Sequence, residues 1–132
     1  MNIKIIENPP VRELNKVQEQ LSFEQGLGIV DIWCSLNPSY LLAVESGENA
    51  GILSLSVGDE MAEVYKLYVP KAHRRKGVGR ALFNHAVSLL REQGIKEIGI
   101  EAVGDSGLFW NEIISDYRYQ MFPEQNKCIV TI

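Results

Sequence analysis

Apolar and polar residues alternate along several short segments of the chain, and this period of two is typical of β-strands that bury one face. The clearest alternation covers residues 39–46, 50–57 and 63–69, with the turn-forming sequences GEN and GDE between these segments. Residues 3–6 and 126–132 are also rich in apolar residues. The pattern predicts an antiparallel meander of three strands and one further strand near each end.

Helical spacing replaces this alternation in two places. Residues 8–21 predict a helix with two prolines at its N-terminal end, where a missing N–H costs least. Gly94 is well placed to end a second helix before a strand at residues 96–103. The apolar residues of this second helix repeat at helical spacing before Gly94: Leu82, Ala86, Leu89 and Leu90.

The segment from residue 22 to residue 38 has no clear period, and here we expect a short helix over GIVDIWCSL, residues 28–36. The order of strand, loop, helix and strand over residues 63–103 predicts a right-handed crossover. At 132 residues the chain fits one domain, residues 1–132, of the α/β (α+β) fold class.

Composition places the chain among ordinary globular proteins, with 45% hydrophobic and 23% charged residues. The longest apolar runs are far shorter than the roughly 20 residues of a membrane helix, and the first residues lack the layout of a signal peptide. We therefore expect a cytoplasmic protein with no membrane partner. Cys34 and Cys128 are isolated and histidines are not clustered, so neither disulfides nor a metal site are predicted.

Positive charge is concentrated in one stretch, although the net charge of the chain is −4. A nucleic-acid-binding protein is more often basic overall, because it must neutralise many phosphates. A compact basic patch on an acidic protein favours one small polyanion instead. Six of the 13 lysines and arginines form this patch: Lys66, Lys71, Arg74, Arg75, Lys76 and Arg80.

The sequence HRRKGVGRAL, residues 73–82, leads directly into the second predicted helix. The first N–H groups of a helix are free and lie at the positive end of its dipole, so they bind anions, and glycines let the anion come close. A dinucleotide fingerprint would need glycine at Leu82, and a Walker loop would need a Gly-Lys-Ser/Thr ending. Neither of these phosphate loops is present.

The remaining pattern, R-x-x-G-x-G at Arg74, Gly77 and Gly79, resembles the pyrophosphate loop of the GNAT superfamily of acyl-CoA-dependent N-acetyltransferases. The preceding EVYKLYV resembles the fourth strand of that family, with its L-x-V ending at Leu67 and Val69. The resemblance extends over about residues 50–104. One departure from the family pattern is Pro70, which directly follows Val69 and is therefore one position out of register with the family's proline.

The resemblance implies a central mixed, largely antiparallel sheet that splays between its fourth and fifth strands and is flanked by helices. Acetyl-CoA would bind in this opening, its pantetheine arm held by backbone groups of Leu67, Tyr68 and Val69. The cations of the loop would add screened attraction to the phosphates of acetyl-CoA. The alternative is that these cations only keep the start of the helix solvated. The family's pyrophosphate-binding N–H groups fall here on Arg75, Lys76, Gly77, Val78, Gly79 and Arg80, preceded by Arg74.

Glu63 resembles the strand carboxylate that histone-type members of this superfamily use as a general base. By strand alternation it would share a face with Tyr65, Leu67 and Val69, and this apolar neighbourhood would raise its pKa. The alternative is a solvated glutamate at the start of a strand. By family analogy, a backbone N–H near Leu67 would stabilise the oxyanion.

In many family members a tyrosine on the helix after the fifth strand is the candidate general acid. The corresponding stretch here, VGDSGLFWNEI, has Phe109 followed by Trp110, so no general acid is assigned. Tyr117 or Tyr119 could donate the proton, or the thiolate could leave unaided, since the pKa of a thiol is about 8.5. The family's following Gly-Phe is absent too, so we expect residues 105–122 to be built differently. His73 is expected in the loop, and His85 on the surface of the second helix.

These inferences predict an enzyme that transfers an acetyl group from acetyl-CoA to a primary amine by direct attack in a ternary complex. Two alternatives stay open: a catalytically silent acyl-CoA-binding regulatory module, and a nucleic-acid-contacting module, which the acidic composition disfavours. The amine acceptor could be a small molecule or a protein, and the sequence does not identify it. The oligomeric state is open as well, and a homodimer is one of the possibilities.

Overall fold

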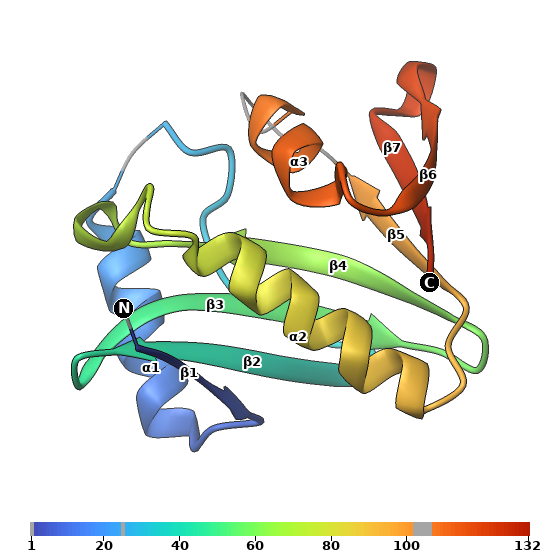
Figure 1. Cartoon of the computed structure of the whole chain (residues 1–132). Helices are drawn as coiled ribbons and strands as arrows, with labels where there is room; N and C mark the ends of the chain where they lie inside the picture. Colours follow the sequence, from blue (N-terminus) through green and yellow to red (C-terminus); the bar gives the residue numbers. More distant parts are fainter. Residues whose placement is uncertain (1, 25, 102–106) are drawn as a thin grey trace.

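The computed structural model describes residues 2–24, 26–101 and 107–132, in which seven strands form one sheet in the order β1-β2-β3-β4-β5-β7-β6 (Figure 1). Three α-helices and two short 3-10 helices connect them. The strands are β1 (Ile3–Glu7), β2 (Pro38–Glu45), β3 (Glu48–Val57), β4 (Met61–Tyr68), β5 (Glu97–Glu101), β6 (Arg118–Phe122) and β7 (Lys127–Thr131). The helices are α1 (Val11–Ser22), η1 (Lys71–His73), α2 (Val78–Glu92), α3 (Gly107–Ile114) and η2 (Pro123–Gln125).

Strand pairing confirms the predicted mixed, largely antiparallel sheet. Strands β1 to β4 form consecutive antiparallel pairs, which include the predicted meander. Strand β5 is parallel to β4 across the α2 connection, whereas β7 is antiparallel to both β5 and β6. The edge strand β6 was not expected from the sequence. The last two residues of the predicted strand 96–103 lie outside the described residues.

The sheet splays between β4 and β5, as the resemblance implies. The two strands pair only over residues 61–64 of β4 and 97–100 of β5. Strand β4 continues to Tyr68, and in Figure 1 β5 turns away from it toward β7 and β6. The end of β4 therefore has a backbone edge that β5 does not cover.

Helices α1 and α2 cover opposite faces of the sheet. Leu41 and Leu42 are neighbours in β2, yet Leu41 packs in the core under α2 and Leu42 in the smaller core under α1. This is the alternation that the sequence shows, with both faces of the central strands buried. None of the helices in the described part of the chain is both long and apolar enough to span a membrane.

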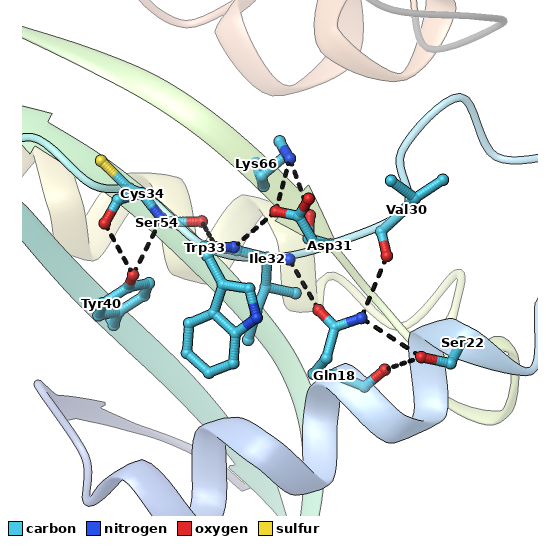
Figure 2. A network of polar contacts seen from close by, with 10 residues as sticks. All are labelled: Gln18, Ser22, Val30, Asp31, Ile32, Trp33, Cys34, Tyr40, Ser54 and Lys66. Carbon is cyan, nitrogen blue, oxygen red and sulfur yellow. Dashed lines mark hydrogen bonds and ion pairs between the residues drawn. The ribbon is translucent and has the colours of Figure 1, made fainter.

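The short helix expected at residues 28–36 is wrong, because this segment runs extended over the α1 side of the sheet (Figure 2). The side-chain amide of Gln18 in α1 donates to the carbonyl of Val30 at 3.1 Å and accepts from the N–H of Ile32 at 3.0 Å. These bonds replace the backbone partners that a helix would have supplied.

Two further side chains hold the same segment. The Tyr40 hydroxyl accepts from the N–H of Cys34 at 3.0 Å and donates to the Cys34 carbonyl at 3.1 Å. The Ser54 hydroxyl on β3 donates to the carbonyl of Ile32 at 2.7 Å, and the Ile32 side chain is fully buried. The segment therefore has no regular secondary structure but is held beside β3 and β4 by these side chains.

Candidate functional site

A hollow of about 560 Å³ lies beside the end of β4 that β5 does not cover. It is bounded by the end of β4, the loop before α2, one side of α3 and the segment that follows α1. Every residue predicted to bind the cofactor lines this hollow except Lys76. The other lining residues are Gly26, Leu27, Ile29, His73, Phe109, Glu112 and Ile113.

The loop before α2 has the backbone that an anion site needs. Gly77 caps the helix with φ +82°, and Arg75 also lies in the left-handed region at +63°. The N–H of Ala81 donates to the Gly77 carbonyl at 3.0 Å. The N–H groups of the three residues between them have no intrahelical acceptor and lie at the positive end of the dipole. The start of α2 can therefore bind a phosphate group.

Most cations of this loop are neutralised by the protein itself. This changes their expected role, because a paired cation adds less attraction to a phosphate than a free one. Among the residues that the structure describes, no acidic side chain pairs with Arg75, which is exposed. The paired cations are Arg74 with Glu24 at 2.5 Å, Lys76 with Glu45 at 3.4 Å and Arg80 with Asp116 at 3.2 Å.

Arg74 fastens the loop to the rest of the protein. Its guanidinium binds the Glu24 carboxylate and its Nε donates to the Val69 carbonyl at 2.8 Å. Glu24 also accepts from the Tyr68 hydroxyl at 2.6 Å. Burial tends to raise the pKa of Glu24, but the hydrogen bonds from Tyr68 and Arg74 outweigh it and lower that pKa. The ion pair weakens the attraction that Arg74 can offer a phosphate and gives its side chain a positioning role. Nothing in the sequence pointed to Glu24.

Replacing Glu24 by glutamine is expected to lower the free energy of unfolding at pH 7 by about 1–3 kcal/mol, since hydrogen bonds to a charged group are lost. The pKa of Glu24 is lowered by folding, so its contribution is present above the ordinary glutamate pKa and is lost as the pH falls through the folded value. Urea unfolding should therefore show the difference at pH 7 and a smaller difference in acid. Glu19→Gln, at an exposed position of α1, is the matched control and should change little; equal effects of both variants would contradict this role.

His73 makes a second attachment of the loop. The histidine was expected in the loop, but it belongs to η1 and is only 6% exposed. Its Nδ1 lies 2.9 Å from Glu45 and its Nε2 lies 3.2 Å from Glu48. The hydrogen bond to His73 is the main cause that lowers the pKa of Glu45. The hairpin of β2 and β3 therefore holds the residues that precede the anion site.

Glu63 does not share a face of β4 with Leu67 and Val69, contrary to expectation. The register of β3 and β4 shifts next to Tyr65, which adds one residue to β4 and reverses the alternation beyond it. As a result Leu67 and Val69 pack against the α2 core, while Glu63 lies on the α1 face with Tyr68. The predicted apolar enclosure is also wrong, because Glu63 is exposed.

A second hollow, of about 550 Å³, lies on this other face over β4, β5 and β7, and Glu63 lines it. Gly99 of β5 is directly opposite Glu63 in the register. A Cβ atom at position 99 would lie 3.0 Å from Met61 Cε and 3.5 Å from Glu63 Cγ. The missing side chain thus makes room for both residues. Tyr65 and Lys66 line this hollow and the next residue, Leu67, lines the first.

Neither tyrosine considered as a general acid lines either hollow. The Tyr117 hydroxyl donates to Asn84 on α2 at 2.5 Å, and Tyr119 on β6 is 47% exposed. Trp110 is buried and packs edge-on against Phe83. These positions do not support either tyrosine as the acid, and the expectation that remains is a thiolate that leaves unaided. The stretch expected to differ from the family, residues 105–122, contains α3 and β6 in its described part.

A comparison with known families and with curated proteins gives one match. The model of the acetyltransferase (GNAT) family matches residues 8–107, most of the chain. No curated protein matches the sequence.

Solved structures share the fold at low sequence identity. The paia N-acetyltransferase of Thermoplasma acidophilum, in complex with coenzyme A, is 14% identical with a TM-score of 0.75, over 99% of this chain and 98% of that one. Tetrahymena GCN5 is 15% identical with a TM-score of 0.74, over 100% and 96% of the two chains. An aminoglycoside acetyltransferase from an uncultured soil metagenomic sample, in complex with sisomicin, is 18% identical with a TM-score of 0.66, over 91% and 92%. At these identities the likeness shows the fold alone.

Proposed function

Because the chain belongs to the acetyltransferase (GNAT) family, we propose that it transfers the acetyl group of acetyl-CoA to a primary amine by direct attack in a ternary complex. The observation that carries the proposal is the hollow at the open end of β4, which ends at the free N–H groups of α2. A coenzyme A complex of a protein with this fold supports acetyl-CoA as the donor.

In this proposal the donor lies along the uncovered edge of β4. The backbone groups of Leu67, Tyr68 and Val69 hydrogen-bond the amides of the pantetheine arm, as an added strand would. The pyrophosphate binds the first N–H groups of α2, and Arg75 adds attraction from the exposed side of the loop. Arg74 and His73 hold this backbone in place through Glu24, Glu45 and Glu48.

The amine binds in the second hollow, beside Glu63. Alkylamines have a pKa of about 10.4, so the attacking nitrogen must lose a proton at neutral pH. Glu63 accepts this proton, directly or through a water molecule, as the nitrogen attacks the thioester carbonyl carbon. A backbone N–H near Leu67 stabilises the oxyanion, the C–S bond then breaks, and coenzyme A leaves as a thiolate that solvent protonates.

A silent acyl-CoA-binding module is the second candidate. It is favoured by the position of Trp110, which is buried where many family members carry a tyrosine. The two candidates share the donor site and differ only in turnover. Coenzyme A release in the presence of amines separates them.

The donor site is tested by thermal unfolding with acetyl-CoA. A ligand at 100 times its Kd adds about 2.7 kcal/mol, so the wild-type Tm should rise clearly. Arg75→Gln should reduce this rise and Arg75→Glu should reduce it further, most strongly at low salt, because charge is removed and then reversed next to the phosphates. The two variants share the same backbone strain at position 75, so each controls the other. A rise that is the same in all three proteins would contradict the assignment.

A further inference from the structure

The charged side chains that line the second hollow each have an opposite charge as a neighbour, except at one residue. Two lysines and two glutamates line it. Lys66 is bound by Asp31, with Nζ 2.9 Å from the carbonyl oxygen and 3.1 Å from Oδ1 (Figure 2). Glu101 of β5 lies directly opposite Lys127 of β7, where opposite charges attract. In the register Glu63 has no cation opposite it on either neighbouring strand, β3 or β5, so it is the carboxylate of the hollow that lacks such a neighbour.

The rest of the lining is largely apolar. Met61 and Tyr65 contribute from β4, Phe122 from the end of β6 and Ile129 from β7. Ile129 is opposite Gly99 in the register of β5 and β7, so it lies across the floor of the hollow from Glu63. The volume of about 550 Å³ is that of a site for a small molecule.

We propose that the acetyl acceptor is a small monoamine whose ammonium group is carried on an apolar or aromatic body. This inference rests on the proposed function. One carboxylate matches one ammonium, and the apolar side chains match the body of the molecule. A diamine, polyamine or aminoglycoside brings further ammonium groups, which would meet apolar surface or lie near Lys127 and Lys66. A charge that is desolvated without a partner is costly, so these amines are disfavoured.

The test measures coenzyme A release from acetyl-CoA with 2-phenylethylamine, ethylamine, 1,4-diaminobutane, spermidine and kanamycin. We expect kcat/KM for 2-phenylethylamine to exceed that of each multiply charged amine by at least about tenfold, and that of ethylamine by a similar factor through apolar contacts. A multiply charged amine that matches or exceeds 2-phenylethylamine would overturn the inference and leave the proposed function intact. Release with none of the amines, in protein that binds acetyl-CoA, would overturn both.

A variant pair tests whether this hollow sets the preference. Ile129→Glu places a second carboxylate across the floor from Glu63, and we expect it to shift the ratio of kcat/KM toward 1,4-diaminobutane by about tenfold or more. Thr131→Glu adds the same charge two residues along the same strand and face, outside the lining, and should leave the ratio unchanged. An unchanged Tm rise with acetyl-CoA shows that each variant is folded. Equal ratios in both variants would overturn the assignment, and if Ile129→Glu does not fold, the wild-type panel decides.

Discussion

Glu63→Gln is expected to lower the rate of acetyl transfer at pH 7 by about 10²- to 10⁴-fold, the usual contribution of a general base. Glutamine keeps the shape of the side chain over Gly99 but cannot accept the proton of the amine. In the proposed function acetyl-CoA binds in the other hollow, so its affinity should stay nearly unchanged. Steady-state kinetics and acetyl-CoA binding, measured on the same protein, check the two parts of this expectation.

The matched control for this variant is Glu101→Gln. Glu101 lines the same hollow, but it lies opposite Lys127, and its replacement should have a much smaller effect on kcat. The loss in Glu63→Gln should also shrink as the pH rises toward the pKa of the amine, about 10.4 for an alkylamine, because free amine needs no base. Near wild-type turnover of Glu63→Gln at pH 7 would show that Glu63 is a solvated strand residue.

Gly79→Glu is expected to abolish the Tm rise that acetyl-CoA causes in the wild-type protein. Position 79 lies in the first turn of α2, so the new carboxylate would stand at the N–H groups that we propose bind the pyrophosphate, and it would repel the phosphates. A Cβ atom there would also lie 2.7 Å from Phe109 Cζ, so the ring of Phe109 must move. The expected loss is the whole ligand contribution, about 2.7 kcal/mol at 100 times the wild-type Kd.

Gly79→Ala separates the two causes. Alanine has the same contact with Phe109 but no charge, and the double variant Gly79→Ala/Phe109→Ala removes the contact as well. We expect the double variant to retain most of the Tm rise, Gly79→Ala to retain part of it, and Gly79→Glu none. Retention of the full rise in Gly79→Glu would place the phosphates somewhere other than the start of α2.

The parts of the fold that the sequence predicted are those governed by local spacing. The alternation in residues 39–69 and the helical spacing after Gly79 depend on neighbours in the chain, and the structure confirms both. The helix expected at 28–36 failed because side chains from other elements, Gln18 and Ser54, hold this segment extended. A local pattern carries no information about such partners.

In the candidate site, too, features set by neighbouring residues were predictable and those set by distant residues were not. The glycine loop was found because its residues are adjacent in the sequence, and the splay followed from the family resemblance. The pairing of Arg74 with Glu24 joins residues 50 positions apart, and no pattern links them. The bulge next to Tyr65 was also invisible, since one extra residue in a strand leaves the apolar composition unchanged. It reversed the face assigned to Leu67 relative to Glu63.

We propose that this protein moves an acetyl group from acetyl-CoA to an amine held beside Glu63. The most direct measurement is mass spectrometry of 2-phenylethylamine after incubation with acetyl-CoA and the wild-type protein, alongside Glu63→Gln. We predict N-acetylated amine in amounts equal to the coenzyme A released, no acetylated protein intermediate, and far less product with the variant. Coenzyme A release without acetylated amine, or equal product from both proteins, would contradict this account.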